Sequence, residues 1–329
     1  MQLLSLFCGA GGLDLGFQES GYNLKLAIDW SQAAIDTHKH NFPESNALKL
    51  DLLELGVTGL LELCEHYFSK EEAIGIIGGP PCQGFSRGNP NSFSEDPRNK
   101  LAIFYIDFIQ EAQKHFNIEF VVFENVLGIK DKKHIHTYNK ITSKLDEIGF
   151  IVHENELNAV NFGVAQERKR VIIIAIKEEL SKESILIKPL ASKPGLKTVR
   201  DVIFGLPDPI FFQRNLTDDD IPYHPNHWTM YPKSDKFRNP ALLLNKTRSF
   251  RAIHWDKPSP TIAYGNREIY VHPDKKRRLS IFESMLLQGF PRFFILKGTL
   301  SQQVTQISNA VPPPMAKAIA QSIKDMLRG

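Results

Sequence analysis

Residues 1–175 alternate short apolar runs with longer amphipathic stretches, and this alternation limits the possible folds more than any other feature. Runs such as Gln2–Phe7 and Ile74–Gly78 have the composition of buried strands, whereas Ser31–Asn41 and Asn99–His115 repeat apolar residues at helical spacing. Strands that alternate with helices form a mostly parallel sheet covered by helices. The sequence therefore predicts an α/β fold. Further strands are expected at Asn23–Ile28, Phe120–Glu124 and Val171–Ile176, and a further helix at Asn139–Ile148.

The pattern changes after residue 185. More than half of the 20 prolines fall between Leu186 and Pro273, where helical periodicity is poor and aromatic residues are frequent. Such a composition is typical of a separate domain rich in loops. Helical patterns return at Leu279–Leu287 and Pro314–Leu327. We therefore expect a first domain at 1–185, a smaller second domain at 186–278, and a segment at 279–329 that returns to complete the first domain.

Composition excludes several classes of protein. The chain of 329 residues has no apolar run of about 18 residues and no signal segment, and its three cysteines are too few for a disulfide framework. We therefore expect a cytoplasmic protein without a membrane partner and with free thiols. The net charge of +3 does not by itself indicate a nucleic-acid partner. No metal is predicted, because His224 and His227 lack further ligands at suitable spacing, and both are expected to be loop or phosphate contacts.

Cys82 is the strongest candidate for a catalytic group. It follows the apolar run Ile74–Gly79 and two prolines, and a polar loop follows it. A thiol on a rigid turn at the carboxyl end of a strand lies where open α/β sheets bind ligands, and it can act as a nucleophile. The alternative, a buried core cysteine, fits Cys8 or Cys64 better, because neither precedes a long polar loop.

A second candidate site follows the first strand. The glycine-rich turn Cys8–Leu13 leads into a helix, so a ligand can approach the backbone closely. Asp29 offers an acceptor for ribose hydroxyls, Trp30 an aromatic face for a base, and Asp51 an acceptor for an adenine amino group. The spacing is not the GxGxxG pattern of dinucleotide enzymes, which favours a nucleoside ligand without a pyrophosphate. S-adenosylmethionine fits this description.

Six short motifs follow one another over nearly the whole chain, namely Phe7–Gly12, Gly79–Gln83, Glu124–Val126, Gln166–Arg170, Gln288–Pro291 and Asn309–Pro312. Together, and in this order, they resemble the motifs of the DNA (cytosine-5) methyltransferases. The match is to the compact bacterial modification enzymes, with small departures at Cys8 and Ser308. The resemblance implies a Rossmann-like S-adenosylmethionine-dependent methyltransferase fold, with a mixed, mostly parallel sheet and a smaller, loop-rich target-recognition domain.

The resemblance implies methyl transfer to carbon 5 of cytosine. That carbon becomes nucleophilic only after a thiolate, here Cys82, adds at carbon 6. Glu124 would protonate or hydrogen-bond the ring nitrogen, and Arg168, together with Arg170, would hold the carbonyl oxygen. Without the resemblance, Glu124 would be interpreted as a helix cap or a surface carboxylate, and the two arginines as an edge salt bridge. The cofactor-binding residues implied are Phe7, Gly9, Gly11, Gly12, Asp29, Trp30, Asp51, Leu52, Pro81, Leu101 and Asn309.

The resemblance also implies double-stranded DNA as the substrate and extrusion of the target base from the duplex. Residues 86–99 would then form a lid that brings Arg87 and Arg98 to the phosphates. The basic run 275–278 predicts a phosphate-binding face. Three arginines in the proline-rich region are candidates for reading guanine edges, with ordinary surface charges as the alternative. They are Arg248, Arg251 and Arg267.

Three other functions remain open at this point. A methyltransferase of the same fold that acts on transfer RNA would share the catalytic motifs, whereas a non-enzymatic DNA-binding protein would not need Cys82, Glu124 and Arg168 together. A cysteine hydrolase would need a histidine partner for Cys82, and the sequence places none suitably. We expect a monomer, with any cognate restriction endonuclease acting separately. The DNA recognition sequence cannot be read from these residues.

Overall fold

The computed structural model describes residues 1–81, 99–181, 187, 195–239, 250–261, 263–264 and 268–328. The chain divides into two compact units. Unit 1 comprises Met1–Leu157, Lys169–Lys188 and Ala316–Gly329, and unit 2 comprises Asn158–Arg168 and Pro189–Met315. Each unit is made of segments that are not contiguous in the sequence, so its core is assembled from distant parts of the chain.

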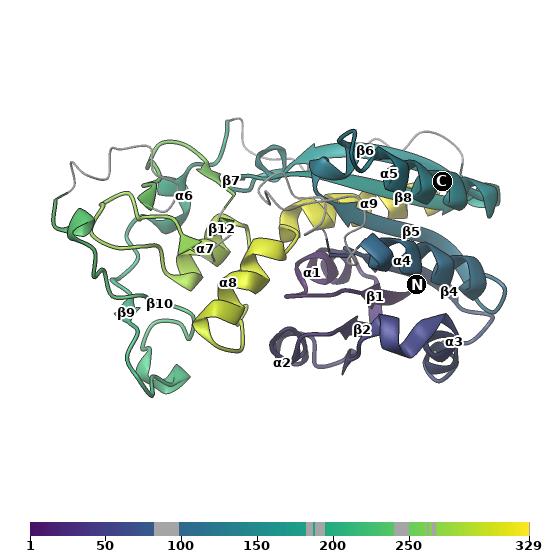
Figure 1. Ribbon diagram of the computed structural model, residues 1–329, viewed down its shortest axis with the longest axis horizontal. Helices are drawn as coiled ribbons and strands as arrows, with labels where there is room; N and C mark the ends of the chain where they lie inside the picture. The colour runs from purple at the N-terminus through teal and green to yellow at the C-terminus, as the bar shows by residue number, and fades with distance from the viewer. Residues whose placement is uncertain are drawn as a thin grey trace. The chain divides into compact units, whose positions relative to one another are not determined.

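Unit 1 contains a seven-stranded sheet with the order β3-β2-β1-β4-β5-β8-β6 (Figure 1). Pairing is parallel from β3 through β5, whereas β8 runs antiparallel to β5. This arrangement confirms the predicted mixed, mostly parallel α/β sheet. The strands are β1 (Gln2–Leu6), β2 (Asn23–Asp29), β3 (Asn46–Lys49), β4 (Ala73–Gly78), β5 (Asn117–Asn125), β6 (Phe150–Asn158) and β8 (Lys169–Lys177).

Helices cover both faces of this sheet, because alternate strand residues point to opposite sides. On one face, Val121 and Phe123 of β5 belong to an apolar cluster with residues of α3, α4 and α5. On the other face, the ring of Phe120 stacks on Phe17 of α1 at a centroid distance of 6.0 Å. The helices are α1 (Gly12–Glu19), α2 (Gln32–Asn41), α3 (Leu52–Glu65), α4 (Asn99–Ala112) and α5 (Ile135–Glu147), with 3-10 turns η1 (Leu127–Lys130) and η3 (Glu178–Leu180).

Helix α9 (Pro313–Arg328) carries the carboxyl terminus, and from Ala316 onward it belongs to unit 1. It lies so close to α1 that a Cβ atom built on Gly16 would be 2.4 Å from the nitrogen of Lys317. The Tyr22 hydroxyl also donates to the carbonyl of Ala320 at 3.3 Å. A small residue at position 16 is therefore required for this packing.

The segment 279–329 does not stay together in one unit. Helices α7 (Ile281–Leu287) and α8 (Leu300–Asn309) belong to unit 2, and only the chain from Ala316 belongs to unit 1. Both helices bury polar side chains in the interior of unit 2. In α8, Gln303 accepts hydrogen bonds from Asn226 at 3.1 Å and from the Trp228 indole at 3.2 Å. These contacts differ from the expectation that everything after residue 278 completes the first domain.

Unit 2 has little regular structure, and its described strands are only two residues long. Hydrogen bonds between buried side chains and the backbone take the place of extended strand pairing. The Asn226 amide donates to the carbonyl of Leu296 and accepts from its nitrogen, both at 2.8 Å. The remaining elements are η2 (Ala159–Phe162), β7 (Gln166–Glu167), α6 (Val199–Ile203), β9 (Ile210–Phe211), η4 (Asp218–Asp220), β10 (Trp228–Thr229), η5 (Asp235–Phe237), β11 (Ser259–Pro260), β12 (Ala263–Tyr264) and β13 (Glu268–Ile269).

His224 and His227, which were expected to be loop or phosphate contacts, are buried loop residues, and this rules out the phosphate alternative for His227. Its ring nitrogens lie 3.0 Å from the Ser280 hydroxyl and 2.7 Å from the carbonyl of Pro207, and it is buried. His224 is also buried and stacks on Phe282 at 4.0 Å. Within the described part of the chain, no helix combines the length and the apolar character needed to cross a membrane.

Candidate active site

Glu124 lies at the carboxyl end of β5, beside Arg170 of the neighbouring strand β8. The antiparallel register pairs Glu124 with Ile172, which brings the two side chains together across the strands. Arg170 Nε lies 2.7 Å from Glu124 Oε1, and both side chains are about nine-tenths buried. A Cβ atom built on Gly79 would be 2.8 Å from the other carboxylate oxygen, Oε2. Glycine at position 79 therefore lets the end of β4 approach this carboxylate.

The turn before Cys82 is fixed to the same strand end. Gly78, the last residue of β4, pairs with Phe123, two residues before the end of β5. The Asn125 amide then donates to the carbonyl of Pro80 at 3.3 Å, and its oxygen accepts from the nitrogen of Val126 at 2.9 Å. Cys82 itself lies outside the described residues, as the preceding segment is described only up to Pro81.

The glycine-rich turn is held by the buried carboxylate of Asp29. Its oxygens accept hydrogen bonds from the nitrogen of Gly9 at 2.9 Å and from that of Ser31 at 2.8 Å. Burial raises the pKa of Asp29, while these two N–H groups act in the opposite direction. Phe7 and Gly11 have φ angles of 59° and 76°, so the backbone turns sharply between β1 and α1. Asp29 thus orders the turn in addition to any ligand contact.

Trp30 and Asp51 lie at the same edge of the sheet as this turn. The nitrogen of Leu50 donates to the carbonyl of Asp29 at 3.0 Å, which brings the ends of β2 and β3 together. Trp30 is 71% exposed and offers an open aromatic face. Asp51 caps α3 through Oδ1, which accepts from the nitrogen of Leu53 at 2.9 Å. Leu52 is buried, whereas Pro81 and Leu101 are half-buried.

Unit 2 contains two further predicted site residues, Arg168 and Asn309. Arg168 is fully buried, and its guanidinium donates to the carbonyl of Ser308 at 2.8 Å. Its backbone nitrogen donates to the side chain of Asn158 at 3.1 Å. Arg168 therefore fixes the residue before Asn309, which is itself exposed. Positions 168 and 308 are too far apart in sequence for any pattern to have indicated this contact.

Of the predicted DNA-binding arginines, only Arg251 is described, and it is exposed. The others, Arg87, Arg98, Arg248 and Arg267, lie outside the described residues. The basic run requires one correction, because Arg277 is not a phosphate contact. Its guanidinium makes two 2.9 Å hydrogen bonds to the buried carboxylate of Glu283, whereas Lys276 is exposed. Only part of the basic run is therefore available to a nucleic acid.

Sequence reasoning missed two surface features of unit 2. Arg200 lies over the rings of Phe204 and Trp255, at 5.5 and 5.4 Å from their centroids, and also pairs with Asp256. Phe204 is 66% exposed, so the cluster is open to solvent. An arginine with aromatic neighbours is typical of nucleic-acid surfaces, but Trp255 lies 55 residues after Arg200 in the sequence.

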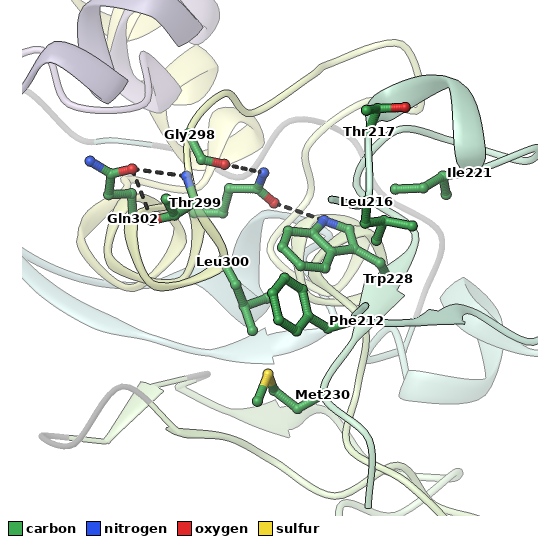
Figure 2. Close-up of a pocket in the computed structure, with 11 residues that line it drawn as sticks. Phe212, Leu216, Thr217, Ile221, Trp228, Met230, Gly298, Thr299, Leu300 and Gln302 are labelled. Carbon is green, nitrogen blue, oxygen red and sulfur yellow. Dashed lines mark hydrogen bonds between the residues drawn. The ribbon is translucent and has the colours of Figure 1, made fainter. Parts of the chain in front are cut away.

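The second feature is an apolar groove of about 620 Å³. Figure 2 shows Trp228, Phe212, Leu300 and Met230 forming its apolar wall. The Trp228 indole is held by Gln303, which also donates to the carbonyl of Gly298 at 2.8 Å. None of the lining residues is titratable, so the groove offers no acid, base or nucleophile.

Comparisons with known proteins agree with this geometry. The family model of the C-5 cytosine-specific DNA methylases matches residues 1–325. The chain belongs to this family. The chain is 32% identical to the Type II methyltransferase M.MthTI of Methanothermobacter thermautotrophicus, covering 100% of this chain and 98% of that protein. It is also 32% identical to M1.HphI of Haemophilus parahaemolyticus, covering 98% of this chain and 86% of that protein.

Solved structures support the same assignment. An E. coli prophage protein, assigned as a DNA modification methyltransferase, aligns with a TM-score of 0.82 and 25% identity over the full length of both chains. Dnmt2 of S. pombe aligns at 0.67 with 17% identity, covering 100% of this chain and 98% of that one, which shows the fold alone. The protein is therefore a DNA (cytosine-5) methyltransferase, as predicted.

Proposed function

We propose that this methylase acts on one cytosine within a short duplex DNA sequence, through a covalent bond between Cys82 and carbon 6 of an extruded base. The observation that carries the proposal is the ion pair of Glu124 and Arg170 at a strand end, next to the turn that Asn125 fixes before Cys82. A nucleophile, a carboxyl group and a guanidinium would then meet the same ring. This set matches the requirements of addition at carbon 6.

Each side chain has a distinct task in this proposal. The Cys82 thiolate adds to carbon 6, and the electron pair moves into the ring, so carbon 5 becomes nucleophilic. Glu124 donates a hydrogen bond or a proton to the ring nitrogen, which stabilises the added charge. Arg170 holds the Glu124 carboxyl in position, and Arg168 binds the carbonyl oxygen. Carbon 5 then takes the methyl group, and a base removes the proton from carbon 5 so that the electron pair returns to the ring and Cys82 leaves as the thiolate.

S-adenosylmethionine is the proposed cofactor, and it supplies an electrophilic methyl group when bound. The first strand end supports this choice. The turn at Gly9 and Gly11 allows close backbone approach, Trp30 presents an exposed ring, and Asp51 leaves a second carboxylate oxygen beyond the one that caps α3. Asn309 is proposed as a further contact on the basis of its motif alone.

The relatives named Type II methyltransferases suggest a restriction-modification role. We propose that a cognate endonuclease, if encoded, acts separately and that the methylase works as a monomer. Arg251, with Arg248 and Arg267, is proposed to read base edges, and Arg87 and Arg98 to contact phosphates from a lid over the extruded base. Lys275 and Lys276 are proposed to bind phosphates without sequence preference.

Methyl incorporation tests this proposal. The native protein is incubated with radiolabelled cofactor and either duplex DNA or transfer RNA, and methylated cytosines are mapped by bisulfite sequencing. We expect label in DNA at one sequence. Glu124→Gln should lower kcat by about 10²- to 10⁴-fold, because the carboxyl acts in the transition state. Label in transfer RNA alone would instead support the alternative substrate, and full activity of the Gln variant would contradict the role of Glu124.

A further inference from the structure

A second group of reactive side chains lies beside the glycine-rich turn, and the proposed reaction does not use it. Cys8 belongs to the turn, Asp14 to α1 and His38 to α2. All three are buried, and Asp14 and His38 have no exposed surface. The cysteine sulfur, one carboxylate oxygen and one ring nitrogen lie within 4.8 Å of one another. Cys8 and Asp14 are 6 residues apart and His38 follows 24 residues later, a spacing that matches no common metal-ligand motif.

The polar atoms of Asp14 and His38 are poorly satisfied. Neither carboxylate oxygen of Asp14 and neither ring nitrogen of His38 forms a hydrogen bond within the described ranges. Their closest approach is 3.4 Å, between Oδ2 and Nε2. Enclosing a carboxylate and an imidazole without hydrogen bonds carries a desolvation cost for each unsatisfied group. A bound cation would remove this cost.

The geometry suits a tetrahedral metal ion. Bonds of about 2.0–2.3 Å place the ligand atoms of a zinc site roughly 3.3–3.8 Å apart. The Asp14–His38 separation of 3.4 Å already falls in this range. All three ligand atoms lie within 4.8 Å of one another, so closing the site to this range needs a shift of the sulfur of about 1 Å. One sulfur, one nitrogen and one oxygen favour zinc over calcium or magnesium, which prefer oxygen ligands alone.

We propose that Cys8, Asp14 and His38 bind a divalent ion of the zinc class and so tie the glycine-rich turn to α1 and α2. Binding exchanges the thiol proton of Cys8 for the metal, and the proton is released to solvent. Three protein ligands and one water form a common zinc set. The site is distinct from Cys82 and Glu124, so it serves to order the turn and not to carry the methyl transfer.

Cobalt provides a direct probe of this site, because a thiolate bound to Co²⁺ gives an absorption band in the near ultraviolet. The full-length protein is freed of metal with a chelator and titrated with Co²⁺, and then with Zn²⁺ in competition. We expect one equivalent of Co²⁺ to produce the band and Zn²⁺ to abolish it. Zinc should also raise the unfolding midpoint, because it binds only the folded protein.

Matched variants separate this cysteine from the other two. Cys64 is a second buried thiol of unit 1 on α3, so Cys64→Ser controls for the loss of a core sulfur. Cys8→Ser should abolish the band, and His38→Gln should weaken zinc binding by at least roughly 100-fold, since the loss of even an outer partner costs 10- to 100-fold. Cys64→Ser and Cys82→Ser should keep the band.

The variants are first compared with the native protein by circular dichroism. Should Cys8→Ser fail to fold, His38→Gln and the native titration still decide the question. Absence of a stoichiometric cobalt band in the native protein would overturn the proposal, as would a band that persists in a folded Cys8→Ser variant. In that case Asp14 and His38 form a buried pair without a metal. Neither result depends on whether the protein methylates DNA.

Discussion

The sheet of unit 1 is built from strands whose buried residues are almost all apolar, whereas unit 2 encloses many polar side chains. In β8, Val171–Ile176 are six consecutive apolar residues with no exposed surface. In unit 2, the interior contains Asn226, His227, Gln303 and the pair of Arg277 with Glu283. A buried apolar side chain needs no specific partner, whereas every buried polar group needs a hydrogen-bond partner. Unit 2 should therefore be the part whose stability depends on specific contacts and on pH.

The largest effect is expected in unit 1, at Phe120. Its ring is fully buried against Phe17 and Tyr22, so Phe120→Ala should lower the free energy of unfolding by about 3–5 kcal/mol. Urea unfolding followed by far-ultraviolet circular dichroism measures this loss. Phe293→Ala serves as the control, because Phe293 is 70% exposed and should tolerate the change. Equal losses in both variants would mean that the sheet core is not the main source of stability.

A loss of about 3 kcal/mol is expected for Glu283→Ala in unit 2, because it leaves the buried guanidinium of Arg277 without its partner. In a Trp30→Phe background, the fluorescence of Trp228 and Trp255 follows the unfolding of this unit. Asp256→Ala is the matched control, since it breaks an exposed pair with Arg200 and should have no measurable effect. Replacing both Arg277 and Glu283 by Met should restore most of the loss, whereas an additive double variant would show that the pair itself is unimportant.

A third test addresses DNA recognition by unit 2. Arg251→Ala should relax selectivity at one base position by about 1–3 kcal/mol, if its guanidinium reads a guanine edge. Lys276→Ala should weaken binding to all sequences alike and lower the slope of the salt dependence by about one. Methylation of a library of DNA sites, followed by sequencing, separates the two outcomes. An Arg251 variant that keeps the native site preference would make this arginine a phosphate contact.

The smallest expected effect is a loss of stability at acidic pH. Burial lowers the pKa of His227 and of His272 in unit 2. Below about pH 6.5 the unfolded chain binds protons that the folded histidines do not, so stability should fall as pH drops through this value. Glu283, whose pKa is lowered through its hydrogen bonds with Arg277 despite the opposing effect of burial, adds a further loss at lower pH.

Tryptophan fluorescence in urea, at about pH 7.5 and about pH 5.5, measures the change across the histidine range. The midpoint should be lower at the acidic pH, and His227→Gln should reduce the difference. A midpoint that is equal at both values would show that the buried histidines do not contribute in this way.

The sequence predicted unit 1 well because its signals are local. Apolar composition predicted the strand at Gln2–Phe7, and helical spacing predicted the helix at Ser31–Asn41, where Ser31 caps α2 by accepting from the nitrogen of Ala34. Helix α5 begins four residues earlier than expected, at Ile135. The proximity of Glu124 and Arg170 follows from the antiparallel register of β5 and β8, which no local pattern specifies.

Unit 2 was harder to predict because its contacts join distant positions. Asn226 bonds to Gln303, and Arg168 to the carbonyl of Ser308. Ser280 holds His227 in its loop, so only the loop alternative holds there, and Glu283 holds Arg277, so the expected phosphate contact at Arg277 was wrong. Arg277 carries the same charge as its exposed neighbour Lys276. Arg277 is buried because it pairs with the carboxylate of Glu283, a contact that the charge pattern does not reveal. Composition showed that the region is rich in loops but could not show which polar residues face inward.

The most direct test of the proposed mechanism uses duplex DNA with 5-fluorocytosine at the target position. Fluorine cannot leave carbon 5 as a proton does, so the thiolate of Cys82 cannot be released after methyl transfer. We expect the native enzyme, with S-adenosylmethionine, to form a covalent DNA complex, and mass spectrometry of its peptides should place the link at Cys82. The Cys82→Ser variant should form no complex and methylate no DNA. A native enzyme that forms no adduct, or a serine variant that turns over normally, would contradict the account.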